Sequence, residues 1–263
     1  MRVRIDISYD GSFFEGFQYQ THTNNTVMNY IIKSLKDINI INKPIGSGRT
    51  DAKVHALRQT LHLDLPPFWS DLNRLFTTLN SLLNPKIIVL KIKEVNSDFH
   101  ASFSAFKREY RYIIYSGKAN PFYSNYFLQM EDFNYEKAKE AAGLFEGKHN
   151  FKFFKKKGSY TTTNIRNIYK IKVYKKGDFT IFNFQSSGFL RAQVRLMVGM
   201  IIEHSKGKIS LEQIKEQLWC KKLHFNRPIL ANGLYLVRSH YPLYSQMPLT
   251  KVASILPKNS SSS

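Results

Sequence analysis

Residues 3–9, VRIDISY, begin the pattern that determines the predicted fold. Apolar and polar side chains alternate along them, which is typical of a β-strand with one buried face. Residues 26–38 have apolar side chains at helical spacing, with Asn25 or Thr26 as the expected N-cap. Two strands, a helix that Ser70 can cap, and a strand at 87–95 follow. This order, β-α-β-β-α-β, is that of a ferredoxin-like or RNA-recognition-type unit.

The second half of the chain repeats the same order. The predicted elements are a strand at 107–115, a helix at 135–146, a hairpin of 165–174 and 178–184 that turns near Lys176-Gly177, a helix at 190–204, an extra helix capped by Ser210, and a strand at 233–239. We therefore expect an α+β fold of two ferredoxin-like (RNA-recognition-like) βαββαβ units. Their antiparallel or mixed sheets would adjoin, with a basic cleft between the units. The expected division is a unit at 1–105, a unit at 106–245 and a solvated tail at 246–263.

The charge balance of the chain suggests a polyanionic partner. Among its 263 residues are 39 Lys and Arg against 19 Asp and Glu, a formal net charge of +20. Nucleic acid is the first expectation and an anionic membrane surface the second, while a general preference for lysine is the alternative. The N-terminus has no hydrophobic signal core, and no apolar run approaches the roughly 18 residues of a membrane span. A cytoplasmic protein without a membrane partner is expected.

The stretch 46–59, GSGRTDAKVHALRQ, is predicted to be a glycine-hinged loop that contains one carboxylate, Asp51. Four cations surround that carboxylate in the sequence: Arg49, Lys53, His55 and Arg58. Nearby cations favour the ionised form of a carboxylate, which can act as a nucleophile or base towards a sugar or a base. The cations could hold phosphates without reading sequence. A structural ion pair inside the loop is the alternative interpretation.

Two further groups of side chains fit a nucleic-acid site. Tyr110 and Tyr112 share one face of the strand at 107–115, where they could stack on bases or pack in the core. Arg191 and Arg195 are four residues apart on one face of the helix at 190–204, so an arginine there could reach a phosphate or Asp51. No His, Cys, Asp or Glu cluster has a metal-ligand spacing, and no nucleotide-binding loop is present. We expect neither metal nor cofactor.

Six segments, taken together, resemble the TruA family of tRNA pseudouridine synthases. They are YDGSFFEGFQYQ (9–20), GSGRTDAKVHALRQTLHL (46–63), DFHASFSAFKREYRYIIY (98–115), GKHNFKFF (147–154), GFLRAQVRLMVGMIIE (188–203) and ANGLYLVRSHYP (231–242). They occur in the family's order and span nearly the whole chain. The second contains the pattern Gly-Arg-Thr-Asp-Ala-x-Val-His, in which the family carries its essential aspartate.

The resemblance implies an RNA pseudouridine synthase, an isomerase that converts uridine to pseudouridine. It implies that Asp51 is the nucleophile, Tyr110 the active-site tyrosine and Arg195 the arginine paired with the aspartate. Arg49 would contact the RNA and help to flip the uridine, with Lys53, His55, Arg58 and Arg191 as further RNA-binding residues. The expected substrate is the tRNA anticodon stem-loop near positions 38–40, and the expected assembly is a homodimer.

Four positions depart from the family pattern, namely Phe17, Lys53, Glu109 and Leu196. None of them removes an inferred catalytic group, but the RNA target can differ where the binding surface has changed. The same chemistry on ribosomal RNA is therefore the second hypothesis. A non-catalytic RNA-binding protein built on two RNA-recognition-like units is the third.

Overall fold

The computed structural model describes residues 1–131, 133–243 and 245, and the tail predicted at 246–263 lies outside them. The first half contains β1 (Arg2–Tyr9), a 3-10 turn (Gly11–Phe13), α1 (Val27–Asp37), β2 (Ile45–Gly46), β3 (His55–Asp64), α2 (Leu72–Leu83) and β4 (Ile87–Glu94). The second half contains β5 (Lys107–Tyr115), β6 (Leu128–Gln129), α3 (Tyr135–Gly143), β7 (Gly147–Asn150), β8 (Ile165–Lys176), β9 (Phe179–Ser186), α4 (Gln193–Ser205), α5 (Leu211–Leu218) and β10 (Leu234–His240). Further 3-10 turns lie at Pro121–Tyr123 and Lys152–Phe154.

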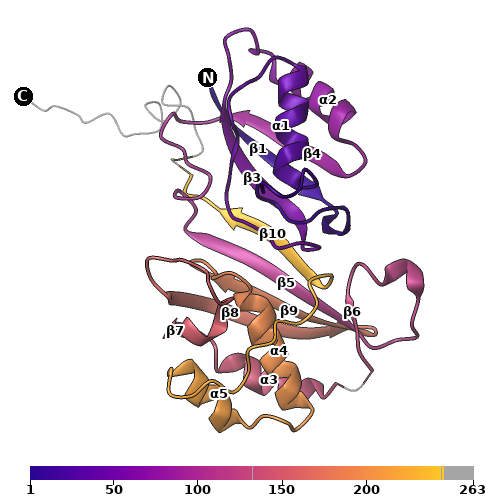
Figure 1. The fold of residues 1–263 in the computed structure, drawn as a ribbon, viewed down its shortest axis with the longest axis vertical. Helices are drawn as coiled ribbons and strands as arrows, with labels where there is room; N and C mark the ends of the chain where they lie inside the picture. Colours follow the sequence, from indigo (N-terminus) through magenta and orange to yellow (C-terminus); the bar gives the residue numbers. More distant parts are fainter. Residues whose placement is uncertain (132, 244, 246–263) are drawn as a thin grey trace, which may run out of the picture.

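The described strands form one ten-stranded sheet in the order β4-β1-β3-β10-β5-β9-β8-β7, with β2 paired to β3 and β6 to β5. In the first half, β1 pairs with β3 and β4 in antiparallel fashion, and so does β2 with β3. In the second half, β5 pairs with β10 and β9, and β9 with β8, again antiparallel. The halves meet where β10 pairs with β3 in parallel, and Figure 1 shows β10 lying between β3 and β5. The α+β fold with a mixed sheet is therefore confirmed.

Helix boundaries follow local capping. Thr26 caps α1 as expected, since its side chain accepts a hydrogen bond from the amide of Asn29 at 3.2 Å. The cap of α2 is Asp71 rather than the predicted Ser70, because the Asp71 carboxylate accepts from two amides of the first turn. The capping box at Ser210 is confirmed.

Two other boundaries differ from the prediction for conformational reasons. Helix α4 begins at Gln193 rather than near 190, because Ala192 has a left-handed backbone with φ of 62° and interrupts the helix. Strand β3 begins at His55, so the last part of the predicted loop is already sheet. The short strands β6 and β7 were not predicted, since two to four residues carry no periodic signal.

Both halves contribute to one hydrophobic core. Apolar residues of β1 pack with the buried faces of α1 and α2, and in the second half α4 is buried over most of its surface. Close packing at α4 depends on Gly199, where a Cβ atom would lie 2.7 Å from the ring of Phe225. None of the helices in the described part of the chain has the length and apolar character needed to span a bilayer.

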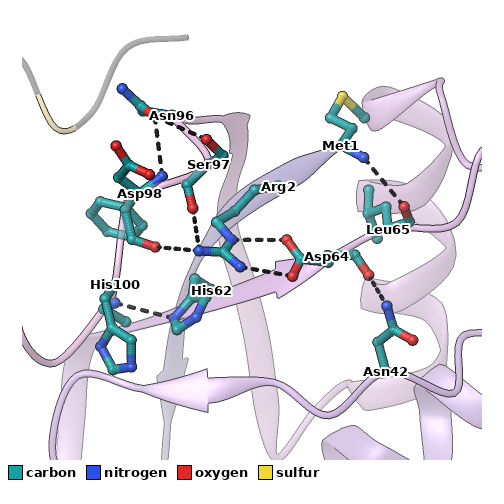
Figure 2. A network of polar contacts seen from close by, with 12 residues as sticks. Met1, Arg2, Asn42, His62, Asp64, Leu65, Asn96, Ser97, Asp98 and His100 are labelled. Carbon is teal, nitrogen blue, oxygen red and sulfur yellow. Dashed lines mark hydrogen bonds and ion pairs between the residues drawn. The ribbon is translucent and has the colours of Figure 1, made fainter. Parts of the chain in front are cut away.

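A polar network fastens the segment after β4 to residues of β1 and β3 (Figure 2). Arg2 forms a bidentate ion pair with Asp64, with two contacts of 2.8 Å, and also donates to the carbonyls of Ser97 and Phe99. The amide of Ala101 donates to Nδ1 of His62 at 3.1 Å. The network holds Ser97, Phe99 and Ala101 in place, and the next residue, Ser102, lines the pocket described below.

The environment of His62 predicts a loss of stability in mild acid. Burial, with smaller contributions from His100 and Arg2, lowers the pKa of His62 from 6.5 to about 4. The unfolded chain therefore binds more protons between pH 4 and 6.5, so this stabilisation is complete above pH 6.5 and is lost as the pH falls towards 4. We expect a loss of about 1–2 kcal/mol at pH 4.5.

Urea unfolding at pH 7 and 4.5 tests this expectation with wild type and His62→Asn. The asparagine can still accept a hydrogen bond from Ala101 but does not titrate. The variant should lose less stability between the two pH values than the wild type. Equal losses in the two proteins would show that His62 does not cause the effect.

Candidate active site

The backbone around Asp51 is held on both sides. Before it, the hydroxyl groups of Thr50 and Tyr9 are 2.8 Å apart, and the Thr50 carbonyl accepts from the amide of Phe17 at 3.1 Å. After it, the amide of Val54 donates to the carbonyl of Asp51 at 3.2 Å, which closes a turn. The turn contains Lys53 with a φ of 64°. Asp51 is thus presented by a fixed turn between β2 and β3.

The same turn explains the requirement for a glycine two residues after the end of β1. A Cβ atom at Gly11 would lie 2.1 Å from the carbonyl oxygen of Val54. The two segments can therefore approach only when no side chain is present at position 11.

Two arginines from the second half meet the carboxylate of Asp51. Arg195 on α4 donates to Oδ2 at 3.1 Å, and Nε of Arg191 lies 3.7 Å from Oδ1. Arg195 also donates through Nε to the carbonyl of Ile229 at 2.7 Å, which fixes the direction of its guanidinium. The expected contact between Arg195 and Asp51 is present. The cations in contact with the carboxylate come from the α4 region, far along the chain from Arg49, Lys53 and Arg58, the cations that neighbour Asp51 in the sequence.

Asp51 is accessible from a pocket of about 1710 Å³ that both halves line. The side chain of Asp51 is 24% exposed, so a ligand in the pocket can contact it. The basic lining residues are Arg49, Lys53, Arg108, Lys155, Lys156, Lys157, Arg166, Arg191 and Arg195. The acidic ones are Glu15 and Asp51. A pocket with this excess of cations suits an anionic ligand with several phosphates.

Tyr110 lies in the wall of this pocket and is otherwise buried, with 9% of its surface exposed. Its ring contacts Phe189 edge to face, with centroids 5.2 Å apart. Burial raises the pKa of Tyr110 to about 12, with Arg108 acting in the opposite direction and Asp51 in the same direction. The phenol is therefore neutral near pH 7. Tyr112, by contrast, is a core residue whose hydroxyl donates to the carbonyl of Leu230.

The structure corrects the expectation for His55. Its side chain is only 3% exposed and lies outside the pocket lining, so it offers no surface to RNA. Nδ1 accepts from the amide of Gly11 at 3.1 Å, Nε2 donates to the carbonyl of Asn125 at 2.9 Å, and the ring stacks on Tyr235. His55 therefore joins the first half to the second. Arg58 is exposed but is not a lining residue of the pocket.

Arg108 is a pocket residue that the sequence analysis missed. Its guanidinium donates to the carbonyls of Ser187 at 3.0 Å, Ser47 at 3.2 Å and Ser102 at 2.7 Å. It thereby ties together segments of both halves around the pocket. The available signal was its position two residues before Tyr110 on a strand, which places both side chains on one face. Lys155, Lys156 and Lys157 form a run of lysines that is typical of a solvated loop, yet all three line the pocket.

The four departures from the family pattern lie in different environments. Phe17 and Leu196 are fully buried in the core. Glu109 is buried and paired with Arg238 at 3.2 Å and His240 at 3.4 Å. Phe17, Lys53 and Leu196 are among the lining residues of the pocket, whereas Glu109 is not, and Lys53 is the exposed one of the four. Within the described ranges, no group of three or more His, Cys, Asp or Glu side chains is arranged to hold a metal ion.

Comparisons with known proteins identify the family of the chain. A family model described as tRNA pseudouridine synthase matches residues 141–242. The tRNA pseudouridine synthase A of Campylobacter jejuni (strain RM1221) is 36% identical over 243 residues, covering 92% of this chain and 100% of the relative. The enzyme of that name from Helicobacter hepaticus is 37% identical over 240 residues, with 89% and 97% covered. The one from Limosilactobacillus reuteri is 36% identical over 248 residues, with 91% and 96% covered.

These relatives define a class of enzymes, the pseudouridine synthases. Within that class, the chain belongs to the tRNA pseudouridine synthase A family. A chain from the crystal structure of a Cbf5-Nop10-Gar1 complex is also similar, with 13% identity and a TM-score of 0.38 over 93% of this chain and 55% of that chain. A likeness of that size does not bear on the fold or the function.

Proposed function

We propose that this protein isomerises uridine to pseudouridine in tRNA, with Asp51 as the reacting carboxylate. The observation that carries the proposal is the position of Asp51, held 3.1 Å from Arg195 and exposed to a basic pocket. The substrate we propose is the anticodon stem-loop near positions 38–40, which rests on the resemblance to the family. Ribosomal RNA is the alternative substrate for the same chemistry.

The reaction moves the base without any net oxidation or reduction. The N1–C1′ bond breaks, the uracil turns, and a C5–C1′ bond forms while C5 loses its hydrogen as a proton and N1 gains one. An ionised Asp51 can begin this sequence by attacking C1′ or by removing the C2′ proton. Arg195 holds the carboxylate in a fixed orientation, because its own Nε is bound to the carbonyl of Ile229. Tyr110 contributes a neutral phenol at the pocket wall.

The target nucleotide has to leave its stack before Asp51 can reach its sugar. The cations that line the pocket would hold the phosphates around the extruded nucleotide, and this contact does not depend on sequence. Arg49 and Lys53 are exposed lining residues of the Asp51 turn and are the proposed RNA contacts closest to it along the chain. Arg191 would contribute from the opposite half.

We further propose that the two halves are ferredoxin-like units, residues 1–105 and 106–245, with the pocket as the cleft between them. The strand order supports this division, since β4-β1-β3-β2 and β10-β5-β9-β8 have the same order and the same antiparallel sense. A homodimer acting on cytoplasmic tRNA is the assembly that the family resemblance implies. Sedimentation of the free protein would test the dimer.

Release of tritium from transcripts labelled at uridine C5 tests the proposed activity, because joining C5 to the sugar expels that hydrogen. Unmodified tRNA and ribosomal RNA transcripts should be assayed in parallel. Release from tRNA alone supports the proposal, and release from ribosomal RNA alone assigns the chemistry to the alternative substrate. Tight binding without release from either pool, in reactions that contain the full cellular set of both RNAs, would indicate a non-catalytic RNA-binding protein.

The basic pocket also predicts a steep dependence of RNA affinity on salt. If about six phosphates are neutralised, affinity should fall by roughly three decades when the salt concentration rises fourfold. Filter binding of tRNA over a salt series measures the slope. Lys156→Ala should reduce the slope by about one, whereas Lys33→Ala, which removes an exposed lysine of α1 outside the pocket, should not. A flat salt response would contradict RNA binding in the pocket.

A further inference from the structure

Tyr160 is a pocket residue with no structural task in the described part of the chain. It is 96% exposed although it lines the same pocket as Asp51. Its ring makes no aromatic contact, and its hydroxyl makes no hydrogen bond, with any described residue. An aromatic ring that contributes nothing to folding yet faces the site is available for a ligand.

The loop that carries Tyr160, residues 155–163, is fastened at both ends. Near its start, the amide of Lys156 donates to the carbonyl of Arg191 at 3.0 Å. Near its end, Arg166 donates to the carbonyl of Thr163 at 3.0 Å, and the amide of Phe151 donates to the carbonyl of Asn164 at 3.0 Å. Arg191 is the residue whose side chain lies 3.7 Å from Asp51. The loop is thus linked through one residue to the reacting carboxylate.

The tip of the loop has the composition of a surface that binds single-stranded nucleic acid. Lys155, Lys156 and Lys157 supply three cations, Gly158 turns the chain with a φ of 74°, and Tyr160 supplies the exposed ring. The Ser159 hydroxyl is buried without a hydrogen-bond partner in the structure. Cations that hold phosphates beside an aromatic ring that stacks on a base are the usual means of binding an unpaired strand.

We propose that Tyr160 is a specificity-determining residue that stacks on an unpaired base flanking the nucleotide engaged by Asp51. The proposal rests on the proposed function. The adjoining lysines neutralise the phosphates of the same strand. A paired neighbour cannot offer its face to Tyr160 without first losing its own stacking, so target uridines beside unpaired nucleotides are favoured over uridines inside a continuous duplex.

A cycle that combines protein variants with RNA changes tests the stacking directly. The RNAs are a tRNA stem-loop and versions that lack the base, but keep the ribose and phosphate, at each position flanking the modified uridine. The proteins are wild type, Tyr160→Ala, Tyr160→Phe and Phe122→Ala. Phe122 is the matched control because it is 83% exposed and does not line the pocket. KM, the single-turnover rate and the dissociation constant are measured for every pair.

Loss of one stacked base corresponds to about a fivefold to 150-fold loss of affinity. Tyr160→Ala should raise KM and the dissociation constant by at least about fivefold, with the single-turnover rate within twofold, while Tyr160→Phe and Phe122→Ala stay close to wild type. Removal of one flanking base should weaken wild type to a similar degree and weaken Tyr160→Ala no further. The flanking position at which base removal and Tyr160→Ala are not additive is the position of the base that stacks on Tyr160.

Two results would overturn the proposal. One is an unchanged dissociation constant for Tyr160→Ala, and the other is full additivity with base removal at every flanking position. Failure of the proposed function gives a different result, namely no isomerisation by wild type on any RNA. In that case the dissociation constants still decide whether Tyr160 stacks on a base.

Discussion

Replacement of Asp51 by Asn should abolish isomerisation while tRNA affinity stays within a few fold of wild type. An amide neither attacks C1′ nor removes the C2′ proton, and removal of a reacting group from an enzyme typically costs a factor of about 10⁴ or more in turnover. The fold should be preserved, because the turn around Asp51 is held by Thr50, Phe17 and Val54 through other atoms. Tritium release and filter binding with the same transcript provide the two measurements.

Glu15→Gln provides the matched control for this variant. Glu15 is the other acidic residue that lines the pocket, so its replacement makes the same change in charge at the same surface. This control should keep turnover within a few fold. If Asp51→Asn retained substantial activity, the proposed role of Asp51 would be wrong. If both variants lost activity, the charge of the pocket rather than the reacting carboxylate would be responsible.

Replacement of Arg195 by Gln should lower turnover by a factor of about 10²–10³ with little change in tRNA affinity, a loss typical of removing one oriented charged donor. The arginine makes a 3.1 Å contact with Asp51 and a 2.7 Å contact with the carbonyl of Ile229, and glutamine cannot reproduce both. Without them the carboxylate is free to rotate away from the sugar. Single-turnover rates at saturating enzyme separate this effect from binding.

Arg191→Gln is the informative comparison because this arginine lies 3.7 Å from the same carboxylate and its side chain is more exposed. Interactions of exposed charges are weaker than those of buried ones, so the loss of turnover should be about tenfold or less. Wild-type rates in Arg195→Gln would refute the pairing as a functional contact. Circular dichroism of both variants checks that the fold is intact.

Much of the secondary structure could be predicted because its causes are local. The alternation in β1 and the cap at Thr26 are visible within about ten residues of sequence. The predicted start of α4 and the missing short strands were wrong because their causes are not local. Ala192 has a left-handed backbone, so α4 begins only at Gln193, and an alanine in the sequence does not indicate that conformation. Short strands such as β6 form because a neighbouring strand is present.

The candidate site was harder to predict because its geometry is long-range. Asp51 and Arg195 are far apart in the sequence; helical spacing offered a contact with Asp51 only beside a contact with phosphate, and the family resemblance alone implied the specific pair. The burial of His55 follows from the approach of Gly11 and Asn125, which lie in other segments. The lysines before Tyr160 look like an ordinary solvated loop until the second half places them beside α4. Residue type indicated charge, and tertiary structure determined which charges converge.

The parallel pairing of β3 with β10, here called the seam, has a consequence for the order in which the enzyme assembles. β10 comes after every other described strand of the sheet, yet it pairs with β3, the strand that follows the Asp51 turn. During synthesis the first half therefore leaves the ribosome before the partner strand of His55 and Ala56 in β3 exists. The nascent protein cannot join its two halves through this seam until the segment at 234–240 has emerged. The pairing that joins the halves carrying Asp51 and Arg195 is therefore among the last strand pairings of the described sheet that become possible.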